Sequence, residues 1–138
     1  MPSQQGSLQS RIQGLDHIAL GVLDIDERIA FFTQVLGLEL RRIGTRHSTG
    51  SRIAMLADPV SGFKIELIET SADEQGLLHL AARVEDVESA YQELQAKGLR
   101  SVRGPHELAA AKAETALLED ASSLGIQIIR YQPDSPDL

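Results

Sequence analysis

The sequence predicts an α+β fold built from two tandem βαβββ modules, each with one strand, one helix and three further strands. The main observation is an internal repeat, because the chain matches itself when it is shifted by 61 or 62 residues. Two half-size units cannot each bury a core alone, so we expect them to pack with pseudo-twofold symmetry around a cleft. The clearest matches pair Leu15 with Leu77, His17 with His79, Ala19 with Ala81, and Asp24 with Asp86.

The first half begins with an apolar strand over residues 15–22. Asp24 predicts the start of a helix, because Glu27 follows at capping-box spacing and Gly37 provides a stop signal. The next three segments have strand patterns, with turn residues at 58–62 before the last of them. These strands are predicted at 38–43, 51–57 and 63–68.

The second half repeats this order. A strand at 77–84 precedes a helix at 86–97 that Gly98 ends. We interpret residues 107–112 as a loop or short turn between strands. The three later strands are predicted at 99–103, 115–118 and 125–131.

The ends of the chain differ in composition from the body. Residues 1–12 are rich in Ser, Gln and Gly, and residues 132–138 contain two prolines, so both are predicted to be disordered. The predicted domain is therefore 13–131, with one module at about 13–70 and the other at about 76–131.

Composition excludes several classes of protein. A net charge of −7 and only five aromatic residues argue against nucleic-acid binding. The absence of cysteine excludes disulfides and thiolate metal sites. There is no apolar run long enough to cross a membrane and no apolar core of a signal peptide, so we expect a cytoplasmic protein with no membrane partner.

Two histidines stand at equivalent positions of the repeat. Because a pseudo-twofold axis brings equivalent points together, we expect His17 and His79 to converge on one metal site, either within one chain or across a dimer. Glu66 lies within an apolar strand, where a charged side chain is costly unless it pairs or binds a cation; exposure to solvent is the alternative. The second-half counterpart of Glu66 is Gln127, although a gapless match selects Ile128 instead.

The chemistry of this set suits one divalent metal ion. Two imidazoles, a carboxylate and an amide oxygen fit Zn, Ni, Co, Mn or Fe. The predicted metal ligands are His17, Glu66, His79 and Gln127.

Several segments resemble the vicinal-oxygen-chelate superfamily, which includes glyoxalases, bleomycin-resistance proteins and dioxygenases. The first is Leu-Asp-His-Ile-Ala-Leu-Gly-Val at 15–22, followed by the helix and Leu-Gly-Leu-Glu-Leu at 36–40. Lys-Ile-Glu-Leu-Ile-Glu at 64–69 resembles the ligand strand, and residues 76–88 resemble the start of the second module. The resemblance covers about residues 14–131 and implies a metal held at the four positions named above.

Within the superfamily, the pattern is most similar to lactoylglutathione lyase and methylmalonyl-CoA epimerase. This similarity implies a metal-dependent lyase, isomerase or epimerase that moves a proton next to a carbonyl group while a divalent ion stabilises the oxyanion. The sequence departs from these enzymes in having Gln127 where they usually have Glu, and in lacking an acid in the loop at 45–51. We therefore assign the catalytic role to Glu66, with His47 as a further candidate base.

Four arginines gather in the first half of this acidic chain. One interpretation is a rim that captures an anionic small-molecule substrate, with Arg46 and Arg52 as the contacts. The alternative is that these arginines pair with the many acidic side chains. The four are Arg41, Arg42, Arg46 and Arg52.

Two other functions remain open from the sequence. An extradiol-type dioxygenase would use His17, His79 and Glu66 as an iron site with Gln127 unligated. A metal-free small-molecule binding or resistance protein would use the cleft without an ion. We also expect the protein to form a homodimer.

Overall fold

The computed structural model describes residues 12–46 and 49–138, and these divide into two compact units. The first unit contains Asp16–His79 together with Asp137. The second contains Leu80–Pro136, the described residues before Asp16, and Leu138. Most of the predicted disordered N-terminus, and His47, lie outside the described residues.

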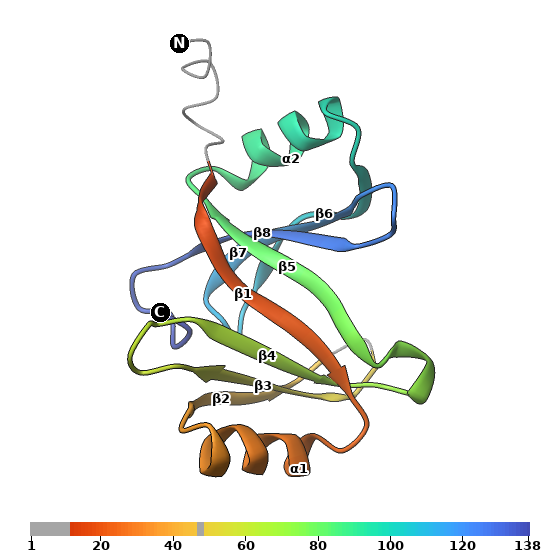
Figure 1. The fold of residues 1–138 in the computed structure, drawn as a ribbon. Coiled ribbons are helices and arrows are strands. Elements are labelled where there is room, and N and C mark those ends of the chain that lie inside the picture. Colours follow the sequence, from red (N-terminus) through yellow and green to blue (C-terminus); the bar gives the residue numbers. More distant parts are fainter. Residues whose placement is uncertain (1–11, 47–48) are drawn as a thin grey trace. The chain divides into compact units, whose positions relative to one another are not determined.

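The first unit is a mixed sheet with one helix on one face (Figure 1). Its strands lie in the order β2-β3-β4-β1, with β1 parallel to β4 and the other neighbours antiparallel. The helix α1 (Ile25–Ala30) continues into a π-helical segment, η2 (Phe31–Val35), and a short 3₁₀ helix, η3 (Ala72–Glu74), precedes the next strand. The strands are β1 (Ile12–Val22), β2 (Glu39–Thr45), β3 (Arg52–Ala57) and β4 (Lys64–Glu69).

Alternation along these strands gives the sheet two different faces. The face toward α1 forms a hydrophobic core in which the buried Ile25 packs against Val22, Ala54, Leu56 and Leu67. The register of β1 against β4 pairs Ala19 with Glu66, so these residues lie on the other face. The core therefore leaves one sheet face available to polar groups.

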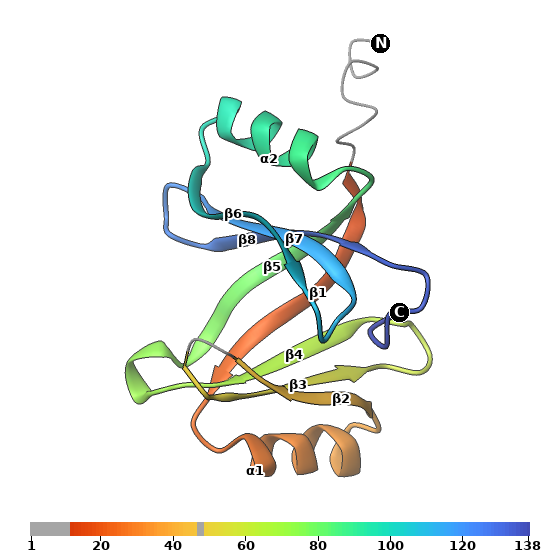
Figure 2. The same cartoon turned by 180° about the vertical axis from the view of Figure 1, so that it is seen from behind.

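The second unit repeats this organisation (Figure 2). Its strands lie in the order β5-β8-β7-β6, and α2 (Val87–Ala96) packs on a core that includes Val84, Ala116, Leu118 and Ile128. The strands are β5 (Gly76–Val84), β6 (Arg100–Leu108), β7 (Ala113–Glu119) and β8 (Gly125–Tyr131). β5 begins in the first unit and ends in the second.

The local signals of the repeat are confirmed in both units. The Asp24 carboxylate accepts from the backbone N–H of Glu27 at 3.1 Å, and that of Asp86 accepts from Ser89 at 3.2 Å. Each bond satisfies an N–H that the first turn of a helix leaves unpaired. The predicted order of strands and helices is therefore correct, with most boundaries displaced by one or two residues.

One predicted loop is partly strand. Residues 107 and 108 belong to β6, which pairs Glu107 with Glu114 and Leu108 with Ala113. The turn follows at 109–112, where Lys112 has a φ of 49°. Pairing with β7 extends the strand through a segment whose Ala-rich composition gives no strand signal.

The segment at 132–138, predicted to be disordered, makes specific contacts in the structure. The Ser135 hydroxyl donates to the carbonyl of Ala111, and the Asp137 carboxylate accepts two bonds from the Arg42 guanidinium, at 2.8 and 2.9 Å. Ser135 and Asp137 are both buried. Specific polar contacts, which hydrophobic periodicity does not report, order this segment.

Among the described residues, no helix is long and apolar enough to cross a membrane.

Gly21→Ala should destabilise the protein. A Cβ at Gly21 would lie 2.1 Å from the carbonyl oxygen of Glu74, a main-chain atom of η3. We expect a loss of about 1–3 kcal/mol in the free energy of unfolding, because the backbone must move to admit the methyl group.

Chemical denaturation measures this loss, with Gly104→Ala as the matched control. A Cβ at Gly104 would lie 3.7 Å from the Tyr91 hydroxyl, an ordinary van der Waals distance. Equal stability of the two variants would contradict the close approach of β1 and η3.

Candidate metal centre

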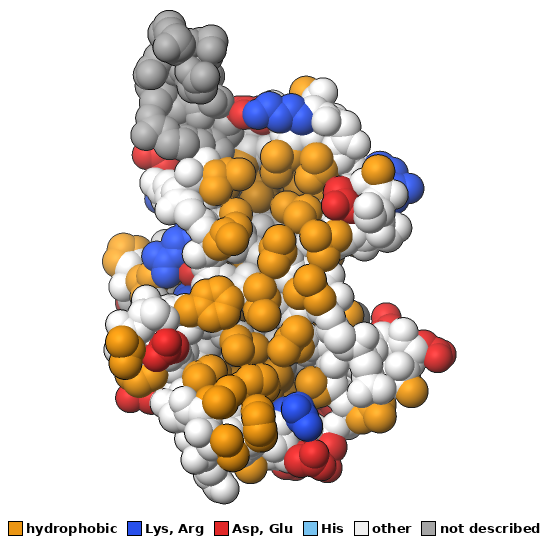
Figure 3. All heavy atoms as spheres, in the orientation of Figure 1, with side chains coloured by type: hydrophobic (Ala, Val, Ile, Leu, Met, Phe, Trp, Pro, Cys, Tyr) orange, Lys and Arg blue, Asp and Glu red, His pale blue; other side chains and the backbone are white. Residues whose placement is uncertain are grey.

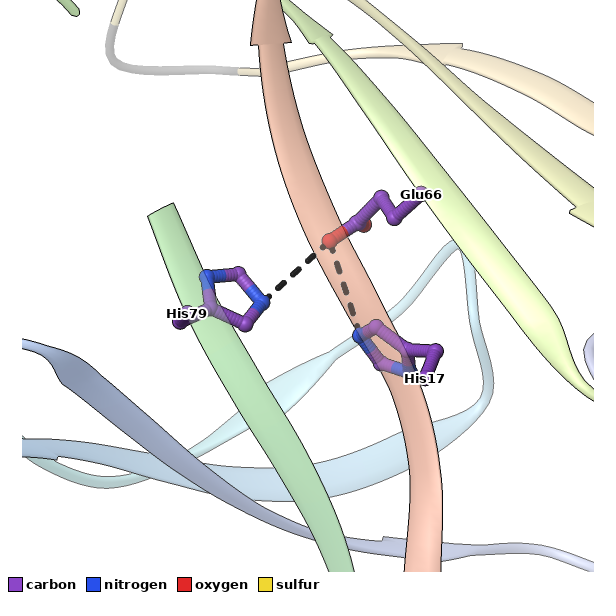
Figure 4. Close-up of side chains that lie close together, drawn as sticks. All are labelled: His17, Glu66 and His79. Carbon is purple, nitrogen blue, oxygen red and sulfur yellow. Dashed lines mark ion pairs between the residues drawn. The ribbon is translucent and has the colours of Figure 1, made fainter. Parts of the chain in front are cut away.

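His17, Glu66 and His79 come together within the first unit (Figure 4). They lie on β1, β4 and β5, respectively. Because β1 pairs Ala19 with Glu66 and His17 with Lys64, the His17 and Glu66 side chains share the sheet face opposite α1. Neither side chain points into the apolar core under the helix.

The three side chains approach one another through their reactive atoms. Glu66 Oε1 lies 3.6 Å from His17 Nε2 and 3.4 Å from His79 Nε2. One ligand atom from each of the three residues lies within 4.8 Å of the others. The two imidazole rings are 5.7 Å apart at their centroids, with 70° between their planes. Both histidines therefore present Nε2 to the same carboxylate oxygen.

The donor set fits a metal ion. Within the described part of the chain, Nε2 of His17 and Nε2 of His79 are buried and have no hydrogen-bond partner. Buried polar atoms are rarely left unpaired in folded proteins, because each carries a desolvation cost. Two imidazole nitrogens and a carboxylate oxygen are ligands that borderline divalent cations prefer, so this group could hold such an ion.

Carboxylates set the charge of this group of side chains. Burial disfavours a charged imidazole, but Asp16 and Glu66 outweigh this cost and raise the pKa of His17 to about 9. Burial likewise disfavours the Glu66 carboxylate, yet His17 and His79 hold the pKa of Glu66 well below its usual range. The group thus combines the ionised carboxylate of Glu66 with the protonated imidazole of His17. A bound cation would replace the proton on His17 Nε2.

Asp16 is a buried partner of the site that the sequence analysis missed. Its Oδ2 lies 2.7 Å from His17 Nδ1, and its Oδ1 lies 2.9 Å from Lys64 Nζ. Asp16 directly precedes His17 in the chain, so the available signal was an acidic residue inside an apolar strand.

Gln127 lies in the second unit, on the face of β8 away from α2. The neighbouring Ile128 is fully buried in the core cluster beneath that helix. Gln127 Nε2 donates to Thr115 Oγ1 at 2.9 Å, and the Thr115 hydroxyl donates to the carbonyl of Ile128 at 2.7 Å. These bonds fix the amide orientation, and among the described residues no partner is found for the buried Gln127 Oε1. Of the two alternatives from the repeat, Gln127 is therefore the residue with a free ligand atom.

The arginines of the first half do not form one cluster of free cations. Arg52 donates to both carboxylate oxygens of Asp26 and also bonds Glu69. Arg42 is bound to Asp137, as described above. In the described ranges, no side-chain partner is found for Arg46. Arg52 and Arg42 are thus paired with acidic side chains, whereas Arg46 remains a candidate for anion binding.

An open pocket of about 590 Å³ lies elsewhere in the first unit, beside α1. It is lined by Leu20, Val22 and Phe32, with Asp24 and Glu27 among its polar residues. Figure 3 shows hydrophobic side chains over much of this face, in the upper half of the view as well as in the lower half, where α1 and β4 lie. The lining of this pocket includes none of the three residues of the candidate metal centre.

Comparison with solved structures identifies the fold. Methylmalonyl-CoA epimerase from Mycobacterium tuberculosis is 26% identical with a TM-score of 0.79, over 90% of this chain and 91% of that chain. A variant of the Streptomyces coelicolor methylmalonyl-CoA epimerase, in complex with 2-nitronate-propionyl-CoA, matches at a TM-score of 0.74 and 20% identity. That match covers 88% of this chain and 99% of the other. The predicted α+β class and glyoxalase fold are confirmed.

Sequence comparison agrees. A 2-epi-5-epi-valiolone epimerase from an Actinomyces species is 33% identical over 115 residues. The match covers 64% of this chain and 62% of that protein, so the chain spans less than two thirds of this relative. Residues 14–128 match the model of the Glyoxalase/Bleomycin resistance protein/Dioxygenase superfamily. This match extends over most of the chain, and the protein belongs to that superfamily.

Proposed function

We propose that this protein is a metal-dependent isomerase or epimerase of the glyoxalase type, which transfers a proton at a carbon next to a carbonyl group. The observation that carries the proposal is the convergence of His17, Glu66 and His79 with two unpaired imidazole nitrogens. The names of the relatives, which are epimerases, favour this reaction over a lyase reaction.

The proposed ligands are His17, Glu66, His79 and Gln127. Gln127 is included because its Oε1 is buried and without a partner among the described residues, and because Thr115 holds its amide group in one orientation. A divalent ion bound by these residues would act as a Lewis acid that stabilises the oxyanion of the substrate. Zn, Ni, Co, Mn and Fe all suit this donor set.

We assign the proton transfer to Glu66. An amide cannot accept a proton near neutral pH, so Gln127 cannot serve as the base. Glu66 is the one carboxylate of the proposed ligand set, and its side chain keeps some exposure, at 14%. His47 is the second candidate and lies outside the described residues.

The proposed substrate is a small anionic molecule that contains a carbonyl group. Methylmalonyl-CoA epimerases act on such a molecule, and Arg46 is the exposed cation that we propose for its capture.

A homodimer and a cytoplasmic location are also part of the proposal. The absence of cysteine is compatible with a reducing compartment, and sedimentation velocity tests the dimer.

An extradiol-type dioxygenase is the second candidate. His17, His79 and Glu66 form a two-histidine, one-carboxylate set, which is typical of non-heme iron oxygenases. Oxygen consumption with catechols that depends strictly on Fe(II) would favour this reaction over the epimerase.

His17→Ala and His79→Ala should each remove most of the bound metal from the purified protein. Each substitution deletes one of three close ligand atoms, whereas His106→Ala is a control outside the group. Elemental analysis should give about one divalent ion per chain in the wild type and in His106→Ala. Undiminished metal in both ligand variants would contradict the ligand assignment and favour a metal-free binding protein.

Glu66→Gln should abolish most of the proton transfer. Loss of a general base typically costs about 10²–10⁴-fold in rate. The measurement is deuterium incorporation into substrate in D₂O, made with enough metal to keep the variant loaded. Activity that survives with metal bound would show that Glu66 is not the base, and His47→Ala would then be the variant to assay.

Arg46→Ala should raise KM for an anionic substrate more than it lowers kcat. The reason is that an exposed guanidinium contributes uniform binding, and this contribution should weaken with rising salt. Arg52→Ala is the matched control, because Arg52 is already paired with Asp26 and Glu69. Equal KM values for Arg46→Ala and the wild type would exclude Arg46 from substrate capture.

A further inference from the structure

A series of buried charged groups contacts the candidate metal centre through the Nδ1 atom of His17. The Asp16 carboxylate bridges two groups, His17 Nδ1 at 2.7 Å and Lys64 Nζ at 2.9 Å. Lys64 Nζ also donates to the main-chain carbonyl of Asp137. The Asp137 carboxylate in turn accepts two hydrogen bonds from Arg42. All of these residues belong to the first unit.

These groups are far more buried than ordinary charged residues. The side chains of Asp16, Lys64 and Asp137 are 0%, 5% and 2% exposed. Removing such charges from water is costly unless each has a well-placed partner. Each group in the series meets this condition through its neighbours, so the position of one constrains the position of the next.

The contact with Asp16 determines which nitrogen of His17 faces the site. A carboxylate accepts a hydrogen bond, so Asp16 keeps a proton on Nδ1 of His17. Nε2, which lies toward Glu66, is then the nitrogen available to a metal. Carboxylates in this position fix the ring orientation of metal-binding histidines and increase their basicity.

His79 lacks such support. In the part of the chain that the structure describes, no carboxylate partner is found at the Nδ1 of His79. The two histidines are therefore unequal, because among the described residues a carboxylate partner at Nδ1 is found for His17 and not for His79.

We propose that Asp16 is a positioning residue for His17, and that Lys64 and Asp137 position Asp16. On this account the segment around Asp137, far from the site in sequence, contributes to metal affinity. The inference rests on the metal site of the proposed function, although its first test below does not require metal or activity.

The first test follows the His17 ring by ¹H–¹⁵N NMR in the metal-free protein. A Nδ1–H bound to a buried carboxylate should give a downfield, slowly exchanging signal. Asp16→Asn should move this signal upfield and speed its exchange, because an amide is a weaker acceptor than a carboxylate. The ring signals of His79 should not change. Asp58→Asn, an equivalent substitution at an exposed turn, is the control.

The second test measures Zn²⁺ affinity by competition with a chelator. Asp16→Asn should raise Kd by about 10–100-fold, the usual effect of losing a carboxylate that orients a ligand. Asp137→Ala should raise Kd by about two- to thirtyfold, the range found for residues that act through a network. Asp134→Ala is its control, because Asp134 lies in the same segment and pairs with Lys112 at the surface.

A purely structural role for these residues would lower the melting temperature but leave the Kd of the folded protein and the His17 signal unchanged. That result would overturn the inference. If Asp16→Asn does not fold, the Kd of Asp137→Ala decides between a positioning role and a purely structural role, because this variant leaves Asp16 and Lys64 in place. A wild-type protein that binds no divalent ion would instead refute the proposed function, and the NMR test of Asp16 on His17 would still stand.

Discussion

The candidate site depends on two buried imidazole nitrogens and one carboxylate that share a small space without satisfying one another. At 3.4 and 3.6 Å, Glu66 Oε1 is too far from His79 and His17 for well-formed hydrogen bonds. Such a group is expensive in a folded protein unless something else binds it. A divalent cation would remove this cost if it were coordinated by all three side chains at once.

The architecture of the first unit creates this arrangement by separating two kinds of sheet face. The helix α1 covers the apolar face, which leaves the opposite face of β1 and β4 to His17 and Glu66. A shift of one residue in the pairing of β1 with β4 would move one of them into the core. The hydrophobic pattern that fixes the register therefore also fixes the ligand geometry.

The sequence predicted the parts of the site that periodicity and repetition report. The repeat identified His17 and His79, the cost of a charged side chain inside an apolar strand identified Glu66, and capping residues located both helices. It did not predict the buried contacts of Asp16, Lys64 or Asp137, because buried ion pairs between distant residues have no periodic signature. For the same reason, the ion pairs of Arg52 with Asp26 and Glu69 were indistinguishable in sequence from an anion-binding rim.

The most direct test of the account is X-ray absorption spectroscopy of the protein loaded with one equivalent of Zn²⁺. We predict two imidazole nitrogens at about 2.0–2.1 Å from the metal, together with oxygen ligands at about 2.0–2.2 Å. The imidazole contribution should fall by half in His17→Ala. A spectrum with no imidazole scattering, or one unchanged by this substitution, would contradict the assignment of His17, Glu66 and His79 as the metal centre.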